Sequence, residues 1–187
     1  MEKIEVSYPD WVDRLVDWDR VYGTIEDRMR LAIAVARENV ERGTGGPFGA
    51  AVFADESGLL VSVGMNLVVT HNNSMLHAEV VALMMAEAKR LSYSLGHEGA
   101  PKHQLVASSD PCAMCLGATI WSGVGSLVTG AALDDARALG FDEGPVDSGS
   151  YRAVEERGVE VVRGVLRVEA REVMALYRER GGEIYNP

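Results

Sequence analysis

The sequence predicts an α/β fold in which a central mixed sheet of about five strands lies between two layers of helices, a three-layer α-β-α sandwich. Short apolar segments of strand length alternate along the chain with longer segments of helical periodicity. The chain has 187 residues, a length that suits one domain with a full core. We therefore expect residues 1–187 to form a single domain.

The N-terminal half begins with an arm, residues 1–23, which Trp11, Trp18 and Tyr22 are expected to anchor by packing. Thr24 then starts a pattern that resembles a capping box, and the helix that follows ends at Gly43. Two strands are predicted next, at residues 48–54 and 59–69, with a hairpin turn at residues 55–58.

The C-terminal half continues the alternation of strands and helices. A helix is predicted at residues 77–91, because an apolar run has an acid at its start and bases at its end. The remaining predicted elements are a loop at 92–102, strands at 105–108, 127–129 and 158–165, and helices that begin at 112, 134 and 167.

Composition limits the classes of function. The formal net charge is −10, which argues against a nucleic-acid partner because such binding needs a basic surface. The charged N-terminus resembles no signal peptide, and no segment has the length and apolarity of a membrane span. The two cysteines lie three residues apart, which excludes a disulfide framework and suits a reducing cytoplasm.

The most informative pattern combines His77-Ala78-Glu79 with Pro111-Cys112-Ala113-Met114-Cys115. This arrangement of His-x-Glu and Pro-Cys-x-x-Cys is the signature of zinc-dependent nucleobase deaminases. We expect His77, Cys112 and Cys115 to bind zinc. Three protein ligands leave the fourth tetrahedral position to water, as in catalytic zinc sites.

The chemistry accounts for the fourth side chain in this pattern, the carboxylate of Glu79. Zinc lowers the pKa of its bound water to about 7, so that hydroxide is available at neutral pH. A carboxylate beside that water must carry its proton to the ring nitrogen and the leaving amine, and Glu79 is the candidate. Because residues 77 and 79 lie on different helix faces, both can reach the metal only if it lies off the helix end.

Each element also has a simpler interpretation. A Cys-x-x-Cys pair can be a redox motif, although that motif usually follows a strand in a thioredoxin-like unit without an upstream His-Ala-Glu. A single buried histidine is more often a core residue than a ligand, and a glutamate in a first helical turn is often only a partner of the helix dipole. His71, His97 and His103 belong to no motif and are predicted to lie on the surface.

Several further segments resemble the cytidine-deaminase-like superfamily and, within it, the bacterial guanine deaminases. The resemblance runs from about Thr24 to the C-terminus and leaves the arm uncovered. The segments that carry it, besides the zinc motif, are residues 46–50 (GPFGA), Asn66, residues 116–121 (LGATIW), residues 140–143 (GFDE) and Tyr185. Asp110 departs from the family, which commonly has a glutamate before Pro-Cys.

The resemblance implies hydrolysis of guanine at C2 to xanthine and ammonia. It implies that Asn66 hydrogen-bonds the base, that Phe48 and Trp121 line it, and that Glu143 binds the purine edge and helps to move protons. Tyr185 would close the site. The family also implies a homodimer in which residues 166–187, a helix and tail, are exchanged, so that Tyr185 could serve the partner subunit.

Other functions remain possible on the sequence alone. A tRNA adenosine deaminase shares the zinc motif but must hold phosphates, and the arginines near the C-terminus alternate with glutamates in a strongly acidic chain. A relative that acts on a triazine, a pterin, cytosine or a nucleoside is a second alternative, because one or two pocket residues set such choices. A zinc-stabilised binding module without catalysis is a third, although it would not need Glu79.

Overall fold

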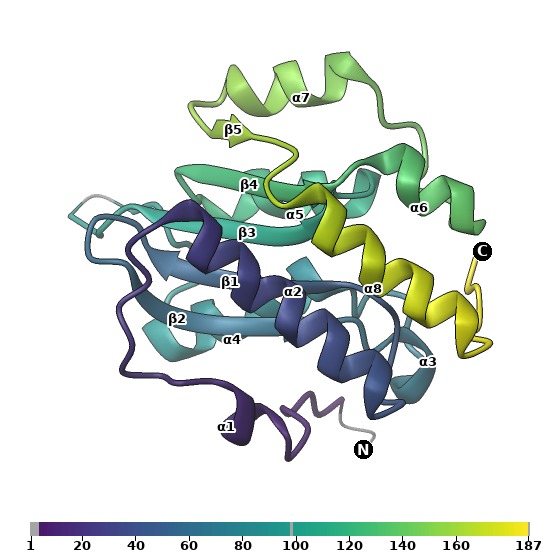
Figure 1. Cartoon of the computed structure of the whole chain (residues 1–187). Coiled ribbons are helices and arrows are strands. Elements are labelled where there is room, and N and C mark those ends of the chain that lie inside the picture. The colour runs from purple at the N-terminus through teal and green to yellow at the C-terminus, as the bar shows by residue number, and fades with distance from the viewer. Residues whose placement is uncertain (1–3, 98, 187) are drawn as a thin grey trace.

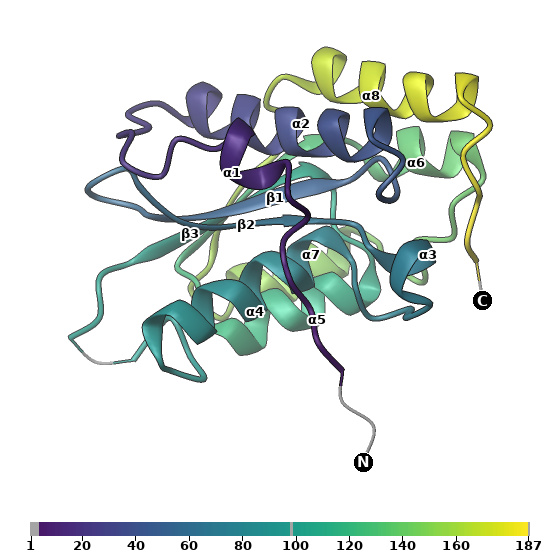
Figure 2. The same cartoon turned by 90° about the horizontal axis from the view of Figure 1, so that it is seen from below.

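The computed structural model describes residues 4–97 and 99–186, and over these residues the chain forms one five-stranded sheet with helices on both faces (Figures 1 and 2). The strands are β1 (Gly49–Ala54), β2 (Leu59–Met65), β3 (His103–Ser109), β4 (Ser126–Ala131) and β5 (Glu160–Val162). The helices are α1 (Val12–Leu15), α2 (Ile25–Glu41), α3 (Val68–His71), α4 (Ala78–Arg90), α5 (Ala113–Ser122), α6 (Leu133–Leu139), α7 (Ser148–Glu155) and α8 (Arg167–Glu179). The predicted three-layer α-β-α sandwich is confirmed.

The sheet is mixed, with strand order β2-β1-β3-β4-β5. β1 pairs antiparallel with β2 and with β3, whereas β3 and β4, and β4 and β5, pair in parallel. Every residue of β1, β3 and β4 is buried, as expected for strands that are covered by helices on both faces.

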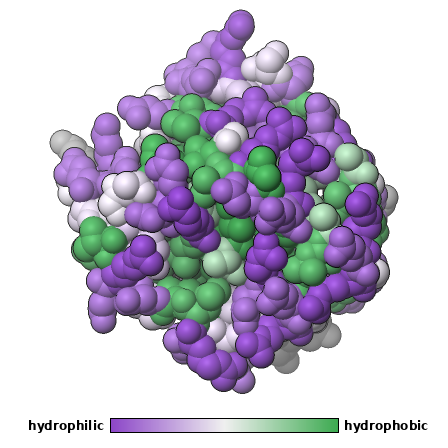
Figure 3. Space-filling model, in the orientation of Figure 1, coloured by the Kyte–Doolittle hydropathy of each residue, from purple (hydrophilic) through white to green (hydrophobic). Residues whose placement is uncertain are grey.

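Two helical layers bury the two faces of the sheet. α2 and α8 cover one face, and α4, α5 and α7 cover the other (Figure 2). Successive side chains of β1 enter different cores, with Ala51 and Phe53 on the side of α2 and Ala50 and Val52 on the side of α4. On the α2 and α8 face, hydrophilic side chains cover most of the outer surface, with hydrophobic ones showing between them (Figure 3).

Helix α4 packs directly on the backbone of strand β2. A Cβ atom on Gly64 would overlap the main chain of Ala78 and lie 2.8 Å from the Cβ of Ala82. Glycine therefore allows the first turn of α4 to approach the sheet more closely than any other residue at this position would.

The N-terminal arm packs against the body of the protein as the aromatic residues predict. The side chains of Trp11 and Tyr22 are each 4 % exposed, and the indole nitrogen of Trp11 donates to the hydroxyl of Thr44 at 3.1 Å. Thr24 caps α2 by accepting a hydrogen bond from the main-chain nitrogen of Asp27 at 3.1 Å, so the predicted start of this helix is also confirmed.

The structure corrects the prediction of a strand over residues 59–69. β2 ends at Met65, and residues 68–71 form the short helix α3. The side-chain oxygen of Asn66 accepts a hydrogen bond from the nitrogen of Val68 at 3.2 Å, which turns the chain away from the sheet. This local bond outweighs the strand propensity of the following β-branched residues.

Three other differences concern the C-terminal half and one histidine. α7 was not predicted, and the last strand covers only three residues of the expected range 158–165. His103, predicted to lie on the surface, is 2 % exposed, because it begins β3 and its Nδ1 lies 3.0 Å from the oxygen of Leu95. In the described part of the chain, no helix combines the length and apolarity needed to cross a membrane.

Candidate metal centre and active site

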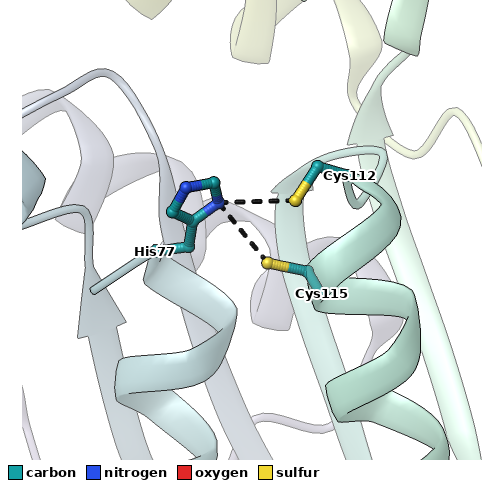
Figure 4. Close-up of side chains that lie close together, drawn as sticks. All are labelled: His77, Cys112 and Cys115. Carbon is teal, nitrogen blue, oxygen red and sulfur yellow. Dashed lines mark hydrogen bonds between the residues drawn. The ribbon is translucent and has the colours of Figure 1, made fainter. Parts of the chain in front are cut away.

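The three predicted metal ligands meet between the starts of α4 and α5. The Nδ1 atom of His77 lies 3.5 Å from the sulfur of Cys112 and 3.6 Å from the sulfur of Cys115, and the three side chains point toward one another (Figure 4). Among the described residues, these three form the group of potential ligands with the spacing of a metal site.

The ligand spacing fits tetrahedral zinc. Zinc–nitrogen and zinc–sulfur bonds of about 2.0–2.1 and 2.3 Å, at the tetrahedral angle, place nitrogen and sulfur about 3.6 Å apart. The two observed distances from His77 Nδ1 match this value. Imidazole and thiolate are also the donors that zinc prefers, so the residues present fit the metal.

Two helix N-termini account for the way in which these residues converge. His77 is the N-cap of α4 and Cys112 is the N-cap of α5, both with extended backbone angles, while Cys115 lies in the first turn of α5. Because His77 precedes the helix proper, its ring and the carboxylate of Glu79 are not restricted to two faces of one helix. The metal position lies off the helix ends, as the spacing of residues 77 and 79 requires.

Hydrogen bonding between the two cysteines shifts their pKa values in opposite directions. Cys115 and then His77 stabilise the charged form of Cys112 and lower its pKa to about 4. Its partner in that bond, Cys115, has a raised pKa, because it acts as the donor and is buried. The lowered pKa of Cys112 favours the thiolate form that a metal ion would bind.

Two acidic side chains lie beside the ligands in a position where ionisation is unfavourable. Burial, reinforced by the charge on Cys112, raises the pKa of Glu79 to about 7. Burial also raises the pKa of Glu143 to about 8, with smaller contributions from Cys112 and Glu79. Glu79 and Glu143 line a small cavity next to the three ligands, and none of its described lining residues is a lysine or arginine. The site therefore concentrates acidic groups whose charged form a bound cation would stabilise.

Two cavities lie beside the ligands, and His77 and Glu143 line both of them. The inner one is small, about 20 Å³, and is lined by Phe48, Asn66, Glu79 and Cys112 among other residues. The outer one is about 380 Å³, within the usual range for small-molecule sites, and is lined by residues that include Met114, Phe141 and Tyr185.

Tyr185 reaches this site from the C-terminal tail. A Cβ atom on Gly46 would collide with the Tyr185 hydroxyl and lie 3.1 Å from the side-chain oxygen of Asn66, so the three residues lie together. The hydroxyl is buried and has no hydrogen-bond partner among the described residues. The tail is held by Asn186, which accepts from the nitrogen of Asp142 at 2.9 Å and donates to the oxygen of Gly140 at 2.8 Å.

Three aromatic rings form one wall of the site. The ring of Phe141 lies 5.1 Å from that of Phe48 and 5.0 Å from that of Tyr185, between centroids. Phe48 is half-buried between the two cores and lines the inner cavity. Phe141 was not predicted to belong to the site, although it stands in the GFDE segment next to Glu143.

Trp121 is the predicted site residue that the structure does not bring to the cavities. Its side chain is 85 % exposed near the end of α5 and lines neither cavity in this chain. A helical pattern identifies which residues share a face, but it does not say whether that face is covered.

Asp110 and Ser109 are further lining residues that sequence reasoning did not assign to the site. Both are buried side chains that line the inner cavity, next to Pro111. The hydroxyl of Ser109 has no hydrogen-bond partner among the described residues. Their place directly before the Pro-Cys motif was the signal available in the sequence.

Comparison with known proteins assigns the chain to a family. Residues 23–131 match the family model described as the cytidine and deoxycytidylate deaminase zinc-binding region. This region contains His77, Cys112 and Cys115, so the expected zinc site is confirmed. A guanine deaminase from Bacillus subtilis (strain 168) is 34 % identical over 134 residues, which cover 72 % of this chain and 81 % of that protein.

Solved structures give the same assignment. The structure of a guanine deaminase from Nitrosomonas europaea is 40 % identical, with a TM-score of 0.90, and the match covers 95 % of this chain and 97 % of that one. A solved protein in complex with 2,6-diaminopurine is 42 % identical, with a TM-score of 0.91, over 97 % of this chain and 96 % of that one. The match to the zinc-binding region and these likenesses over nearly the whole chain show that the protein belongs to the cytidine and deoxycytidylate deaminase family, beside the bacterial guanine deaminases.

Proposed function

We infer that this protein is a zinc-dependent hydrolase that converts guanine and water to xanthine and ammonia. The observation that carries this inference is the open triad of His77, Cys112 and Cys115 beside the buried carboxyl group of Glu79. The substrate follows from the likeness to guanine deaminases over nearly the whole chain. Both thiols are free, and a reducing compartment such as the cytoplasm would keep them so.

Glu79 is the proton carrier in this proposal. Zinc held by His77, Cys112 and Cys115 would supply a Lewis acid and so lower the pKa of a water molecule in the site. Glu79 takes one proton from the attacking water, whose oxygen bonds to C2, and delivers that proton to the ring nitrogen. When the bond between C2 and the amine breaks, the second proton of this water leaves the oxygen as the carbonyl forms. Glu79 and Glu143 carry it to the amine, which departs as ammonia. Its pKa near 7 suits a group that must both accept and release a proton at neutral pH.

Asn66, Phe48 and Tyr185 hold the purine. The side chain of Asn66 lines the inner cavity next to Glu79, where an amide can bind the polar edge of a base. The ring of Phe48 supplies an apolar wall. The Tyr185 hydroxyl, which lacks a partner within the described chain, closes the outer side and donates to the ligand.

Glu143 binds the purine edge and relays a proton to the leaving amine. It lines both cavities, and burial raises its pKa to about 8, a range in which a carboxyl group can both hold and release a proton near neutral pH. An acid between the inner cavity and the outer one is well placed to meet the departing ammonia.

Ammonia release from zinc-loaded protein tests this function. Guanine is the expected substrate, with xanthine appearing in equal amount, and adenine, cytosine, guanosine, cytidine and ammeline are compared with it. If the protein deaminated another heterocycle but not guanine, the proposed substrate would be wrong, while the proposed zinc-dependent reaction would stand. Tight binding of tRNA at moderate salt would favour the adenosine-deaminase alternative, which the net charge of −10 opposes.

We also propose that the protein is a homodimer that uses the outer face of α5. This helix contains no charged residue, and its outward side presents Ala113, Met114, Gly117, Ala118 and Trp121. Met114 also lines the outer cavity, so a second copy on this face would border the entrance to the site. An apolar face of this kind, with an exposed tryptophan at its end, is typical of a covered interface.

Sedimentation of the zinc-loaded protein tests the homodimer. Trp121→Glu is expected to give a monomer, whereas Val21→Glu, which changes an exposed apolar residue outside α5 and outside residues 166–187, should leave a dimer. A wild-type monomer would overturn the proposal.

Exchange of residues 166–187 between subunits is a further part of the proposal. An exchanged dimer would repeat, between two chains, the same contacts that Tyr185 and Asn186 make here within one chain. Mixed refolding of a Glu79→Ala variant with a variant that lacks residues 185–187 tests this. Exchange would restore activity, because one site of the mixed dimer would contain both Glu79 and Tyr185, while lack of recovery would contradict it.

A further inference from the structure

Asp110, the residue before Pro111 and Cys112, is a buried anion with an unusually full set of partners. Its side chain is 1 % exposed. The carboxylate accepts hydrogen bonds from the hydroxyl of Thr129 at 2.5 Å, from the nitrogen of Leu133 at 3.3 Å and from the guanidinium group of Arg163. Its main-chain nitrogen donates to the oxygen of Ala131 at 2.7 Å. Asp110 is thereby fixed to β4 and to the start of α6.

Arg163 extends this anchor into the C-terminal part of the chain. It directly follows β5 and binds Asp110, 53 residues earlier, through Nε at 3.1 Å and also through Nη2. Its guanidinium group lies 4.2 Å from the ring centre of Tyr151 in α7. The planar side chain therefore joins the end of β3 to α7 and to the segment after β5.

Because Asp110 lines the inner cavity, it could be taken for a metal ligand or a substrate-binding residue, but its contacts exclude both roles. Both carboxylate oxygens are occupied by donors from the protein, with Thr129 and Arg163 Nε on Oδ1 and Leu133 and Arg163 Nη2 on Oδ2. A carboxylate held in this way is not free to bind metal or substrate. What it does hold is the main chain that enters Cys112.

Small displacements of that main chain matter for the metal. The distances from His77 Nδ1 to the two sulfurs, 3.5 and 3.6 Å, already have the spacing of tetrahedral zinc. Cys112 is the N-cap of α5 and has extended backbone angles, so the segment that enters it through Asp110 and Pro111 helps to set its position. Side chains that orient ligands in this way contribute strongly to metal affinity.

We propose that Asp110, held by Arg163, is a positioning residue that places Cys112 for zinc binding and so links zinc affinity to the packing of the C-terminal third of the chain. The proposal depends on the zinc site but not on the identity of the substrate. The test therefore measures zinc binding without any nucleobase.

Arg163→Gln is the variant for this test, and Arg167→Gln is its matched control. Arg167 makes an equivalent two-pronged ion pair with Asp135, at 2.7 and 3.0 Å, and its side chain is 48 % exposed compared with 47 % for Arg163. The zinc affinity of each protein is measured by competition with a chromophoric chelator. The absorption spectrum of the cobalt-substituted protein reports the geometry of the ligands.

Arg163→Gln is expected to weaken zinc binding by about 10- to 100-fold and to change the cobalt spectrum. Arg167→Gln should keep the wild-type affinity and spectrum. Arg163→Lys keeps the positive charge but cannot donate two parallel hydrogen bonds, so its zinc affinity should lie between those of wild type and Arg163→Gln.

Wild-type zinc affinity in both Arg163 variants would overturn the proposal. An equal loss in Arg163→Gln and Arg167→Gln would also overturn it, because it would show a general effect on stability. If the wild-type protein bound zinc but left guanine unchanged, the proposed substrate would fail while this inference stood.

Discussion

The side-chain nitrogen of Asn39 lies 2.9 Å from the main-chain oxygen of Asn66, to which it donates a hydrogen bond across 27 residues of sequence. The same nitrogen donates to the oxygen of Gly46 at 2.9 Å, and the side-chain oxygen accepts from Thr44 at 2.7 Å. Asn39 is fully buried on α2 and therefore holds the loop at Gly46 and the chain at Asn66 in place. Tyr185 packs against both of these positions.

Asn39→Ala should lower the free energy of unfolding by about 2–3 kcal/mol, because it leaves two buried carbonyl oxygens without donors. Urea unfolding measures this change. Turnover of guanine should fall as well, since Asn66 loses its support. A change in unfolding free energy of less than about 0.5 kcal/mol, the usual effect of a surface substitution, would contradict this account.

Glu79→Ala should remove nearly all turnover and leave zinc bound. A positioned proton carrier contributes about 10²- to 10⁴-fold to the rate, and Glu79 is not among the three ligands. Steady-state kinetics and metal analysis of the same preparation check both parts. Substantial residual activity would exclude the proposed role.

Glu143→Ala should reduce guanine turnover far more than it reduces stability. Glu143 lines both cavities, and its removal takes away a buried acid whose ionisation the site disfavours. Kinetics and thermal unfolding are compared with those of Glu156→Ala, which changes an exposed glutamate on the surface. Unchanged kinetics in Glu143→Ala would remove this residue from the site.

Deletion of residues 185–187 should impair turnover, and Tyr185→Phe should impair it less. The phenylalanine keeps the ring next to Phe141 but lacks the hydroxyl that has no partner among the described residues. The ratio of kcat/KM between the two variants separates the contribution of the ring from that of the hydroxyl. A fully active truncated protein would refute the closing role of the tail.

Asp135→Asn should lower stability at neutral pH but not in acid. Arg167, followed by the main chain of Ala132, stabilises the charged form of Asp135 and lowers its pKa in the folded protein. The contribution is therefore present above the unfolded pKa of about 3.9 and is lost as the pH falls through the lower folded value. Because the arginine partner is half exposed, we expect about 1 kcal/mol.

Urea unfolding of wild type and Asp135→Asn at pH 7 and at pH 3 measures this difference. Asp134→Asn is the control, since its side chain is 87 % exposed. A difference between wild type and Asp135→Asn that is as large at pH 3 as at pH 7 would show that the charge is not its source.

The layers of the fold and the metal ligands could be predicted from the sequence because both depend on local patterns. The zinc ligands stand in two short motifs, and strands that alternate with helices leave few possible arrangements. The predicted strand 59–69 runs past the true end of β2 at Met65, because a single side-chain bond from Asn66 competes with strand propensity. α7 was missed because it is short and begins with residues 148–150, a run of serine and glycine that is typical of a loop.

The remaining features of the site depend on contacts between distant segments. Asn39, Asp110 and Arg163 have ordinary sequence surroundings, and their importance appears only when the partners of each side chain are known. Trp121 is the reverse case, a residue that was assigned to the site but does not line it. Its helix was predicted correctly, whereas the exposure of the helix face that carries it was not.

Gly64 has a consequence for how an activity screen of this protein would be interpreted. No side chain fits between this position and the first turn of α4. His77 is the N-cap of that helix, and Glu79 lies in its first turn. Even the smallest replacement would push that turn away from the sheet and carry a zinc ligand with it. Inactive variants at position 64 would resemble losses of a catalytic residue, although the glycine contributes only the distance between a strand and a helix.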